Sequence, residues 1–279
     1  MNDLPKQIQR NINRYEPVET DGIALYPVRV EEYEDFLLAK PALEFLQQSL
    51  PVALMTVPIL QAFYTLDVES VMDEQQPTGL LGSALLLLAL ALRIGEGDAP
   101  EKRIRRFHIV PYPEDPRRLK MIAFSLDGEE VHTITPAMFQ RWKPILAAQN
   151  GVELLPDDAN PELVQAEKDV LLKHSLNLDT SMESLVSSVA ALSGVEEAEV
   201  YDWPILKLQN RQNALKRAMD YIICGVGEAS GTKWKQGNPC PHPYFDRIKD
   251  GSLGAIGLDS YLGGAGAEAV QRTQMLEEG

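Results

Sequence analysis

The sequence predicts an α+β fold that is mostly helical and contains a small antiparallel hairpin or sheet. Apolar residues recur mainly at spacings of three and four, which is typical of amphipathic helices. Between residues 104 and 134 the pattern changes to alternation of apolar and polar residues, which is typical of strands. Asp127-Gly128 separates two of these alternating runs and predicts a hairpin, because a type I′ turn needs positive φ at both central residues.

The N-terminal half contains a short strand followed by helices. Residues 23–30 alternate as a strand would, and the helical pattern that follows is expected to break at Pro41, since proline lacks the amide donor. Residues 58–72 form the next predicted helix. The leucine-rich run at 80–94 has only 13 residues before Arg93 without charge. A membrane span needs about 20 residues, so we predict a helix buried on nearly all sides.

Capping signals mark the helices of the second half. Thr135-Pro136 resembles an N-cap followed by proline at the first helical position, and Asn150-Gly151 is expected to end that helix. Asn160-Pro161 predicts the start of another helix. Thr180 with Glu183 forms a predicted capping box, and Gly194 is expected to stop the helix that it opens.

A last amphipathic helix follows a predicted helix near residues 195–208. Leu208, Leu215, Met219 and Ile222 share its apolar face. Gly225 and Gly227 are expected to end it through a left-handed C-cap.

The chain is expected to divide into four parts. These are a flexible N-terminal arm at 1–22, an α+β domain at 23–152, a helical domain at 153–250 and a glycine-rich mobile tail at 251–279. No period of 20 to 50 residues repeats, which argues against a solenoid.

Charge and cysteine content limit the possible partners and compartment. The chain has 279 residues, with 41 acidic and 26 basic side chains and a net charge of −15. Such a field repels polyphosphates, so we expect no nucleic-acid partner. Two cysteines cannot form a disulfide framework, and the first residues hold no apolar signal segment. We therefore expect a cytoplasmic protein without a membrane partner.

The segment at 224–247 holds both cysteines and His242, and three chemical interpretations of it are possible. Its glycines do not have the dinucleotide-loop spacing and do not follow a strand. Cys224, Cys240 and His242 are spaced unlike a zinc site and lack a fourth ligand. A Cys240–His242 dyad is geometrically possible, but no orienting group follows from the sequence. We accordingly predict no catalytic residue, no metal site and no cofactor.

Two groups of basic residues interrupt the acidic background. The first precedes the predicted hairpin and continues within it, where it could form one positive edge: Lys102, Arg103, Arg105, Arg106, Arg117, Arg118 and Lys120. The second lies on the amphipathic helix: Lys207, Arg211, Lys216 and Arg217. Each is either a solvated face paired with acids or a dock for an acidic protein segment.

Several segments, taken in order, resemble those of one protein family. They are ALYPVRVEEYEDFLLAK, TITPAMFQRWKPILAAQN, NPELVQAE, VEEAEVYDWPILKL and GTKWKQGNPCPHPYFDR, within residues 20–247. Their order is similar to that of tail assembly chaperones of long-tailed phages and prophages of Gram-positive bacteria.

The resemblance implies a non-enzymatic assembly factor in the bacterial host cytoplasm. Such a chaperone binds and solubilises the tape measure protein, helps recruit tail tube subunits and tends to self-associate. On this hypothesis Trp203, Trp234, Tyr244 and Phe245 are expected to contact the client, with Lys207 and Arg211 as charge partners. The alternatives are a phage virion component or adaptor and, from a different class, a small Cys/His-dependent enzyme or zinc protein.

Overall fold

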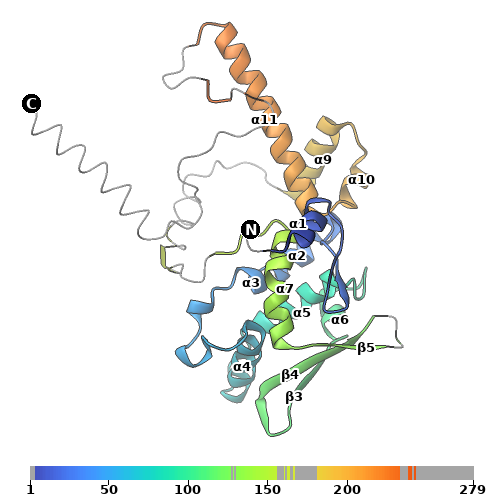
Figure 1. Cartoon of the computed structure of the whole chain (residues 1–279), viewed down its shortest axis with the longest axis vertical. Coiled ribbons are helices and arrows are strands. Elements are labelled where there is room, and N and C mark those ends of the chain that lie inside the picture. Colours follow the sequence, from blue (N-terminus) through green and yellow to red (C-terminus); the bar gives the residue numbers. More distant parts are fainter. Residues whose placement is uncertain are drawn as a thin grey trace, which may run out of the picture. The chain divides into compact units, whose positions relative to one another are not determined.

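A computed structural model describes residues 4–126, 128, 130–155, 160, 162–163, 166, 181–232, 238–240 and 242 (Figure 1). The chain divides into two compact units, 1–154 with 177–246, and 155–176 with 247–279. The described residues belong almost entirely to the first unit. They form helices, one two-stranded and one three-stranded antiparallel sheet, which confirms the predicted α+β fold. The predicted mobile tail lies outside the described residues, and the predicted domain boundary at 152/153 stays a prediction.

The N-terminal segment is folded rather than a loose arm. Helix α1 (Lys6–Asn13) precedes strands β1 (Val18–Thr20) and β2 (Ile23–Leu25). Ile12 and Val18 are buried, and this corrects the expectation of an unstructured arm over residues 4–22. Their apolar side chains were too few to show a period, but they are sufficient to attach the segment to the core.

A two-residue turn joins β1 to β2. Its residues, Asp21 and Gly22, have φ values of 50° and 75°, as a type I′ turn requires. The Asp21 carboxylate accepts hydrogen bonds of 2.8 Å from Trp142 Nε1 and from Arg141. These two contacts, the indole bond foremost, hold the pKa of Asp21 below its usual range although burial opposes them.

Short helices follow the first sheet and lead to two longer ones. As predicted, the first helical stretch breaks at Pro41, with α2 (Tyr33–Ala39) on one side and α3 (Pro41–Glu44) on the other. Three 3-10 turns flank them, at Val30–Glu32, Gln47–Ser49 and Val52–Leu54. Helices α4 (Ile59–Met72) and α5 (Leu80–Ala91) come next.

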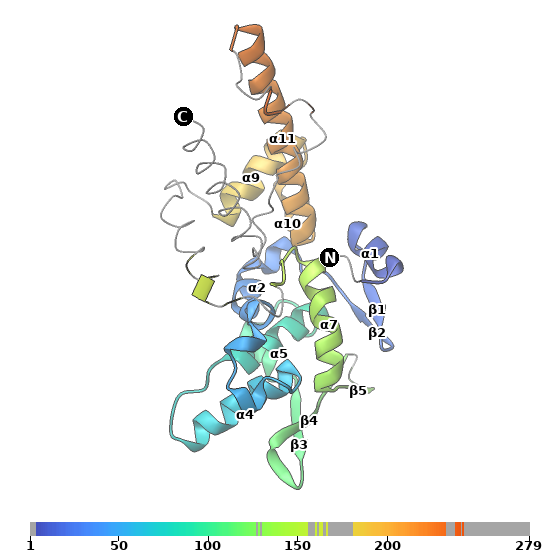
Figure 2. The same cartoon turned by 60° about the vertical axis from the view of Figure 1, so that its left-hand side comes forward.

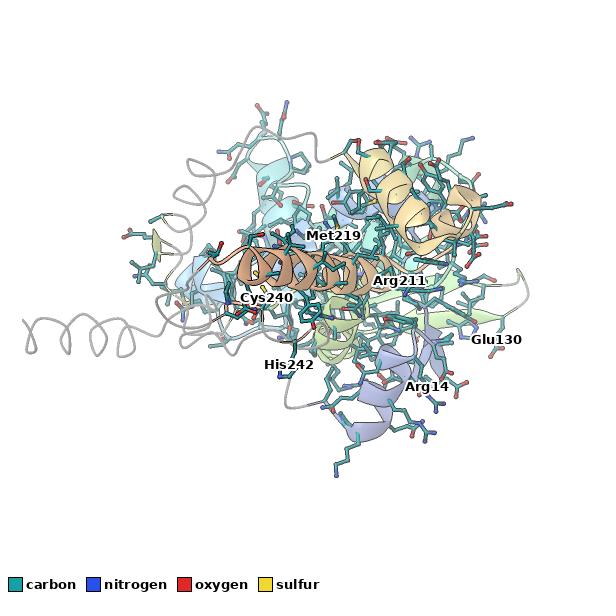
Figure 3. All side chains as sticks on the ribbon, turned by 90° about the horizontal axis from the view of Figure 1, so that it is seen from above. Arg14, Glu130, Arg211, Met219, Cys240 and His242 are labelled. Atoms are coloured by element: carbon teal, nitrogen blue, oxygen red, sulfur yellow. The ribbon has the colours of Figure 1, made fainter. Side chains whose placement is uncertain are left out.

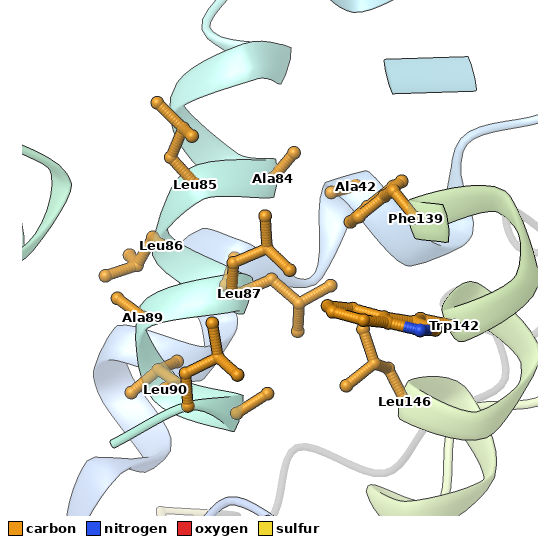
Figure 4. Packing of buried hydrophobic residues seen from close by; sticks show 14 of the residues in the cluster. Ala42, Ala84, Leu85, Leu86, Leu87, Ala89, Leu90, Phe139, Trp142 and Leu146 are labelled. Carbon is orange, nitrogen blue, oxygen red and sulfur yellow. The ribbon is translucent and has the colours of Figure 1, made fainter. Parts of the chain in front are cut away.

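Helix α5 lies at the centre of the first apolar cluster. Residues 84–91 are all buried, which confirms a helix covered on nearly all sides. Figure 4 shows Leu87 directed toward Trp142 of α7 (Pro136–Gln149), and both side chains are fully buried. A fully buried leucine contributes about 1.5–3 kcal/mol through the hydrophobic effect, so this helix is a main source of stability.

The second sheet has the order β3-β4-β5, with β3 (His108–Tyr112), β4 (Asp115–Ser125) and β5 (Val131–Ile134). Helix α6 (Pro100–Ile104) precedes it. The hairpin at Asp127-Gly128 exists, but its loop is longer than a two-residue turn, because Ser125 pairs with Val131. Gly128 has φ +83°, and Asp127 lies outside the described residues.

Helix α4 covers the part of β4 that β5 does not reach. Strand β5 pairs with residues 122–125 alone, which leaves one backbone edge of 116–119 without a strand. The Tyr64 hydroxyl donates to the Pro116 carbonyl at 2.8 Å, and Gln61 Oε1 accepts from the Leu119 amide at 2.8 Å. Side chains of a helix thus satisfy a strand edge that would otherwise be open to another chain.

Helix α7 begins and ends where the sequence predicts. The Thr135 side chain accepts from the Met138 amide, and Pro136 occupies the first turn. After the last turn, the fully buried Asn150 accepts from the Val28 amide at 2.9 Å and donates to the Leu146 carbonyl at 2.8 Å. Gly151 follows with φ +66°, a conformation that favours glycine.

The final helices form a second apolar cluster. They are α9 (Met182–Ser193), α10 (Glu197–Tyr201) and α11 (Ile205–Ala229), shown in Figures 1 and 2. The cluster gathers Val186, Val189, Ala190, Val200, Trp203 and Leu208 around Val30 from the N-terminal half. Backbone bonds from Val30 to Trp203 and from Ile205 to Val28 join the start of α11 to the first half of the chain.

Two predicted helix ends are displaced. The N-cap of α9 is Ser181, whose side chain accepts from the Ser184 amide, instead of the predicted Thr180. Helix α11 continues through Gly225 and Gly227 to Ala229, and Gly231, with φ +88°, follows its end. Gly194 does end α9 in the left-handed conformation, as expected. No helix of the described residues combines the length and the apolar character that a bilayer crossing needs.

Candidate protein-binding surface

The apolar face of α11 is covered along its first half and open along its second. Leu208 is 1% exposed, and Leu215 is partly buried against the second cluster. Met219, Ile222 and Val226 are 49%, 61% and 62% exposed. The face predicted from the sequence is therefore present, but only its N-terminal part packs against this chain.

Helix α9 forms the second wall of a groove along this open face. The groove has a volume of about 500 Å³, and its apolar lining comes from both helices: Leu185, Val189, Leu192, Leu215, Met219 and Ile223. Serines 181, 184 and 188 and the side chains of Gln212, Lys216 and Asp220 line its margins. Leu192 is 56% exposed, so the α9 wall is also incompletely covered. Figure 3 marks Met219 and Arg211 along α11.

Three of the residues predicted to contact a client lie together at the start of α11. The Lys207 ammonium lies 4.0 Å from the centroid of the Trp203 ring, and Trp203 Nε1 donates to Glu199 at 3.3 Å. Trp203 is only 6% exposed, so its ring belongs to the second cluster and offers little surface to a partner. This corrects its predicted role as an exposed contact residue, because packing against Val30 and Leu208 covers the indole.

The two basic residues of this group differ from Trp203 in exposure. Lys207 is partly buried and Arg211 is exposed. Burial lowers the pKa of the Lys207 ammonium, and the nearby Arg211 charge lowers it further, while Glu199 acts in the opposite direction. Arg211 therefore presents an exposed positive charge on α11, on the N-terminal side of the open face.

The remaining predicted contact residues cannot be placed. Trp234, Tyr244 and Phe245 lie outside the described residues. Cys224 is buried, Cys240, which Figure 3 labels, is partly buried, and neither forms a disulfide bond. Within the part of the chain that the structure describes, no three His, Cys, Asp or Glu side chains come close enough together to hold a metal ion.

The basic residues around the second sheet do not form one edge. Arg103 is buried and pairs with Glu32 at 2.9 Å, and Arg106 pairs with Asp98. These residues precede the end of the hairpin at which His108 pairs with Ala123, whereas Arg117 and Arg118 lie at its other end, near the Tyr112–Asp115 pair. The strand register therefore separates the two basic groups by the length of the hairpin.

A second cavity, of about 420 Å³, is lined mainly by carboxylates around the Arg103–Glu32 pair. Burial raises the pKa of Asp35 there, and the Arg103 charge opposes the change. We interpret this cavity as a structural ion-pair site, because Arg103 is buried and pairs with Glu32. Breaking such a buried pair would cost stability.

Comparisons with family models, with curated protein sequences and with solved structures give no match to this chain. The groove must therefore be interpreted from its own geometry. Sequence reasoning found one wall, the face of α11, but did not predict that α9 would lie beside it. The sequence signal for the second wall, α9, is the spacing of four and three between Leu185, Val189 and Leu192.

Proposed function

We propose that this protein is a non-enzymatic tail assembly chaperone that acts in the host cytoplasm. It binds and solubilises the tape measure protein and helps to recruit tail tube subunits. The observation that supports this function best is the open apolar groove between α9 and α11. The segments that resemble the chaperone family supply the identity of the client.

The groove suits a client with helical apolar segments. Contiguous exposed apolar residues on a folded protein commonly mark a binding site, and Met219, Ile222, Ile223 and Val226 are neighbours on one helix. The chain's net charge of −15 favours the same role. Repulsion between acidic coats keeps client-bound particles apart in solution.

Co-expression tests the proposal directly. The full chain is produced together with a candidate tape measure protein from the same genome, and the client's solubility and co-purification are measured. We expect the wild-type chain to keep the client soluble and to co-purify with it. Replacing Met219 and Ile223, which line the groove and are exposed, by serine should reduce the recovered client at least about tenfold, a loss of about 1.4 kcal/mol.

A matched control separates this groove from apolar exposure in general. Val52 is 81% exposed, lies on a 3-10 turn and is not a lining residue of the groove. Val52→Ser should leave client recovery unchanged. Failure of the wild-type chain to co-purify with the client, or its presence in finished phage particles, would contradict the chaperone assignment.

A further inference from the structure

Helix α11 carries the repeat of a helix that pairs with another helix. Its positions at alternating spacings of three and four are Ile205, Leu208, Gln212, Leu215, Met219, Ile222, Val226 and Ala229. A seven-residue repeat of this kind places one apolar seam along a helix. Ile205 and Leu208 are buried in the core, whereas the seam residues from Met219 to Val226 are about half exposed or more. Among the described residues, the groove with α9 takes in the seam at Leu215 and Met219 but not at Ile222 or Val226.

The positions that flank the seam carry positive charge. In this repeat they are Gln209, Arg211, Lys216, Ala218, Ile223 and Gly225. Arg211 and Lys216 are exposed, on opposite sides of the seam, and the set contains no acidic residue. Asp220 also borders the groove, but it lies one step farther round the helix than the flanking positions. Flanking charges set partner choice and orientation in paired helices.

A second copy of this chain is a poor occupant. In a parallel pair, Arg211 of one helix would face Lys216 of the other, and like charges at these positions repel. An antiparallel copy also has no acidic residue at a flanking position to offer. Although the whole chain is acidic, charges farther than about 8–10 Å are largely screened at physiological salt, so the charges that count near the seam are Arg211, Lys216 and Asp220, and their sum is positive.

We infer that the groove between α9 and α11 binds a single amphipathic helix of a partner protein. The bound helix has apolar side chains at spacings of three and four, which cover Leu215, Met219 and Ile223, and Glu or Asp at the positions that flank them. This inference rests on the proposed function in one respect: it specifies the kind of client segment that a chaperone of this shape would select.

Two designed peptides test the inference on the full-length protein. Both have three heptads with Ile and Leu at the seam positions, and they differ only at the flanking positions, which are all Glu in one and all Lys in the other. Like charges at the flanks keep each peptide from pairing with itself in parallel. Binding of the fluorescently labelled peptides is measured by anisotropy.

The Glu-flanked peptide should bind at least about tenfold more tightly than the Lys-flanked peptide. In the double variant Arg211→Glu with Lys216→Glu, the preference should reverse. In Met219→Ser with Ile223→Ser, both peptides should lose binding, because both side chains line the groove. These side chains are exposed, and an unchanged circular dichroism spectrum would show that the variants remain folded.

Three results would overturn the inference. They are equal affinity for the two peptides, binding that survives the Met219→Ser/Ile223→Ser change, and a concentration-dependent dimer that the same change dissolves. The last would mean that a second copy fills the groove. If the Glu-flanked peptide binds as expected but the tape measure protein does not co-purify, the proposed function fails while the groove's specificity stands. If the tape measure protein co-purifies but the two peptides bind alike, the inference alone fails.

Discussion

Helices α5 and α11 show two ways in which one chain uses apolar sequence. Residues 84–91 of α5 are buried on every side, whereas α11 buries only Ile205, Leu208 and Cys224 among its 25 residues. The covered helix contributes stability, and the open one leaves surface for another molecule. The comparison teaches that apolar content alone does not separate a core helix from a binding helix, since coverage depends on neighbours far along the chain.

Truncating one aliphatic side chain in each helix should give the largest difference in stability. Leu87→Ala removes a fully buried side chain beside Trp142, and we expect a loss of about 2–5 kcal/mol in the free energy of unfolding. Ile222→Ala should change it by no more than about 0.5 kcal/mol, because that side chain is exposed. Urea denaturation followed by circular dichroism measures both. Similar losses would show that the distal face of α11 is covered after all.

Asn150→Ala tests the buried hydrogen bond between the Val28 amide and the Asn150 side chain. The substitution leaves the Val28 amide without its buried acceptor, so we expect a loss of about 1–3 kcal/mol in the free energy of unfolding. Asn213→Ala, at an exposed position on α11, is the matched control and should be neutral or slightly stabilising. Equal effects in the same denaturation experiment would mean that Asn150 is not the acceptor.

Two glycine-to-alanine substitutions, one after α7 and one in α11, should change the stability of the protein in opposite directions. Gly151 has φ +66°, and a Cβ there would collide with the Gln209 side chain of α11, so Gly151→Ala should cost about 1 kcal/mol or more. Gly225 is helical with open space around it, so Gly225→Ala should stabilise by about 0.5–1 kcal/mol. Thermal melts measure both changes. Adding Gln209→Ala to Gly151→Ala should recover the steric part of the loss, and a lack of recovery would assign the whole loss to the backbone.

The smallest expected effect concerns Asp21. Its pKa is lowered in the folded protein, so the ionised carboxylate adds stability above the unfolded pKa of about 3.9, and that stability is lost as the pH falls through the folded pKa. Asp21→Asn should therefore lower the melting temperature near neutral pH, and the difference from wild type should shrink below about pH 4. A difference that is the same at pH 7 and pH 3 would refute this account of the Trp142 contact.

Local signals predicted the elements that depend on local chemistry. Thr135, Pro41 and Gly194 act where they were expected, because caps and proline breaks involve only a few neighbouring residues. The turn at Asp21-Gly22 has the same chemistry as the predicted turn at Asp127-Gly128, but its first strand has only three residues, Val18–Thr20, and shows no clear alternation. Gly225 and Gly227 were read as a helix end because glycine weakens a helix, yet the helix continues to Ala229.

The candidate site was only half predictable. The repeat of Leu208, Leu215, Met219 and Ile222 was visible in the sequence, and so were the nearby charges of Lys207 and Arg211. Trp203 was a predicted contact residue, but a tryptophan suits a core as well as an interface, and its ring packs with Val30 in the second cluster. No local pattern reveals a partner that lies about 170 residues away in the chain, as Val30 does.

By itself the sequence determined the α+β class, the bounds of α4 and α7 and the apolar seam of α11, because these follow from spacing and capping within a few residues. Tertiary structure alone decided which apolar faces are covered: α5 on all sides by α2, α3, α4 and the first cluster around them, and α11 only along its first half. Coverage requires segments distant in sequence to meet, and the free energy of burial depends on that meeting and not on the residue type alone. Such segments bury the first cluster, whereas the groove between α9 and α11 is left open for a partner helix.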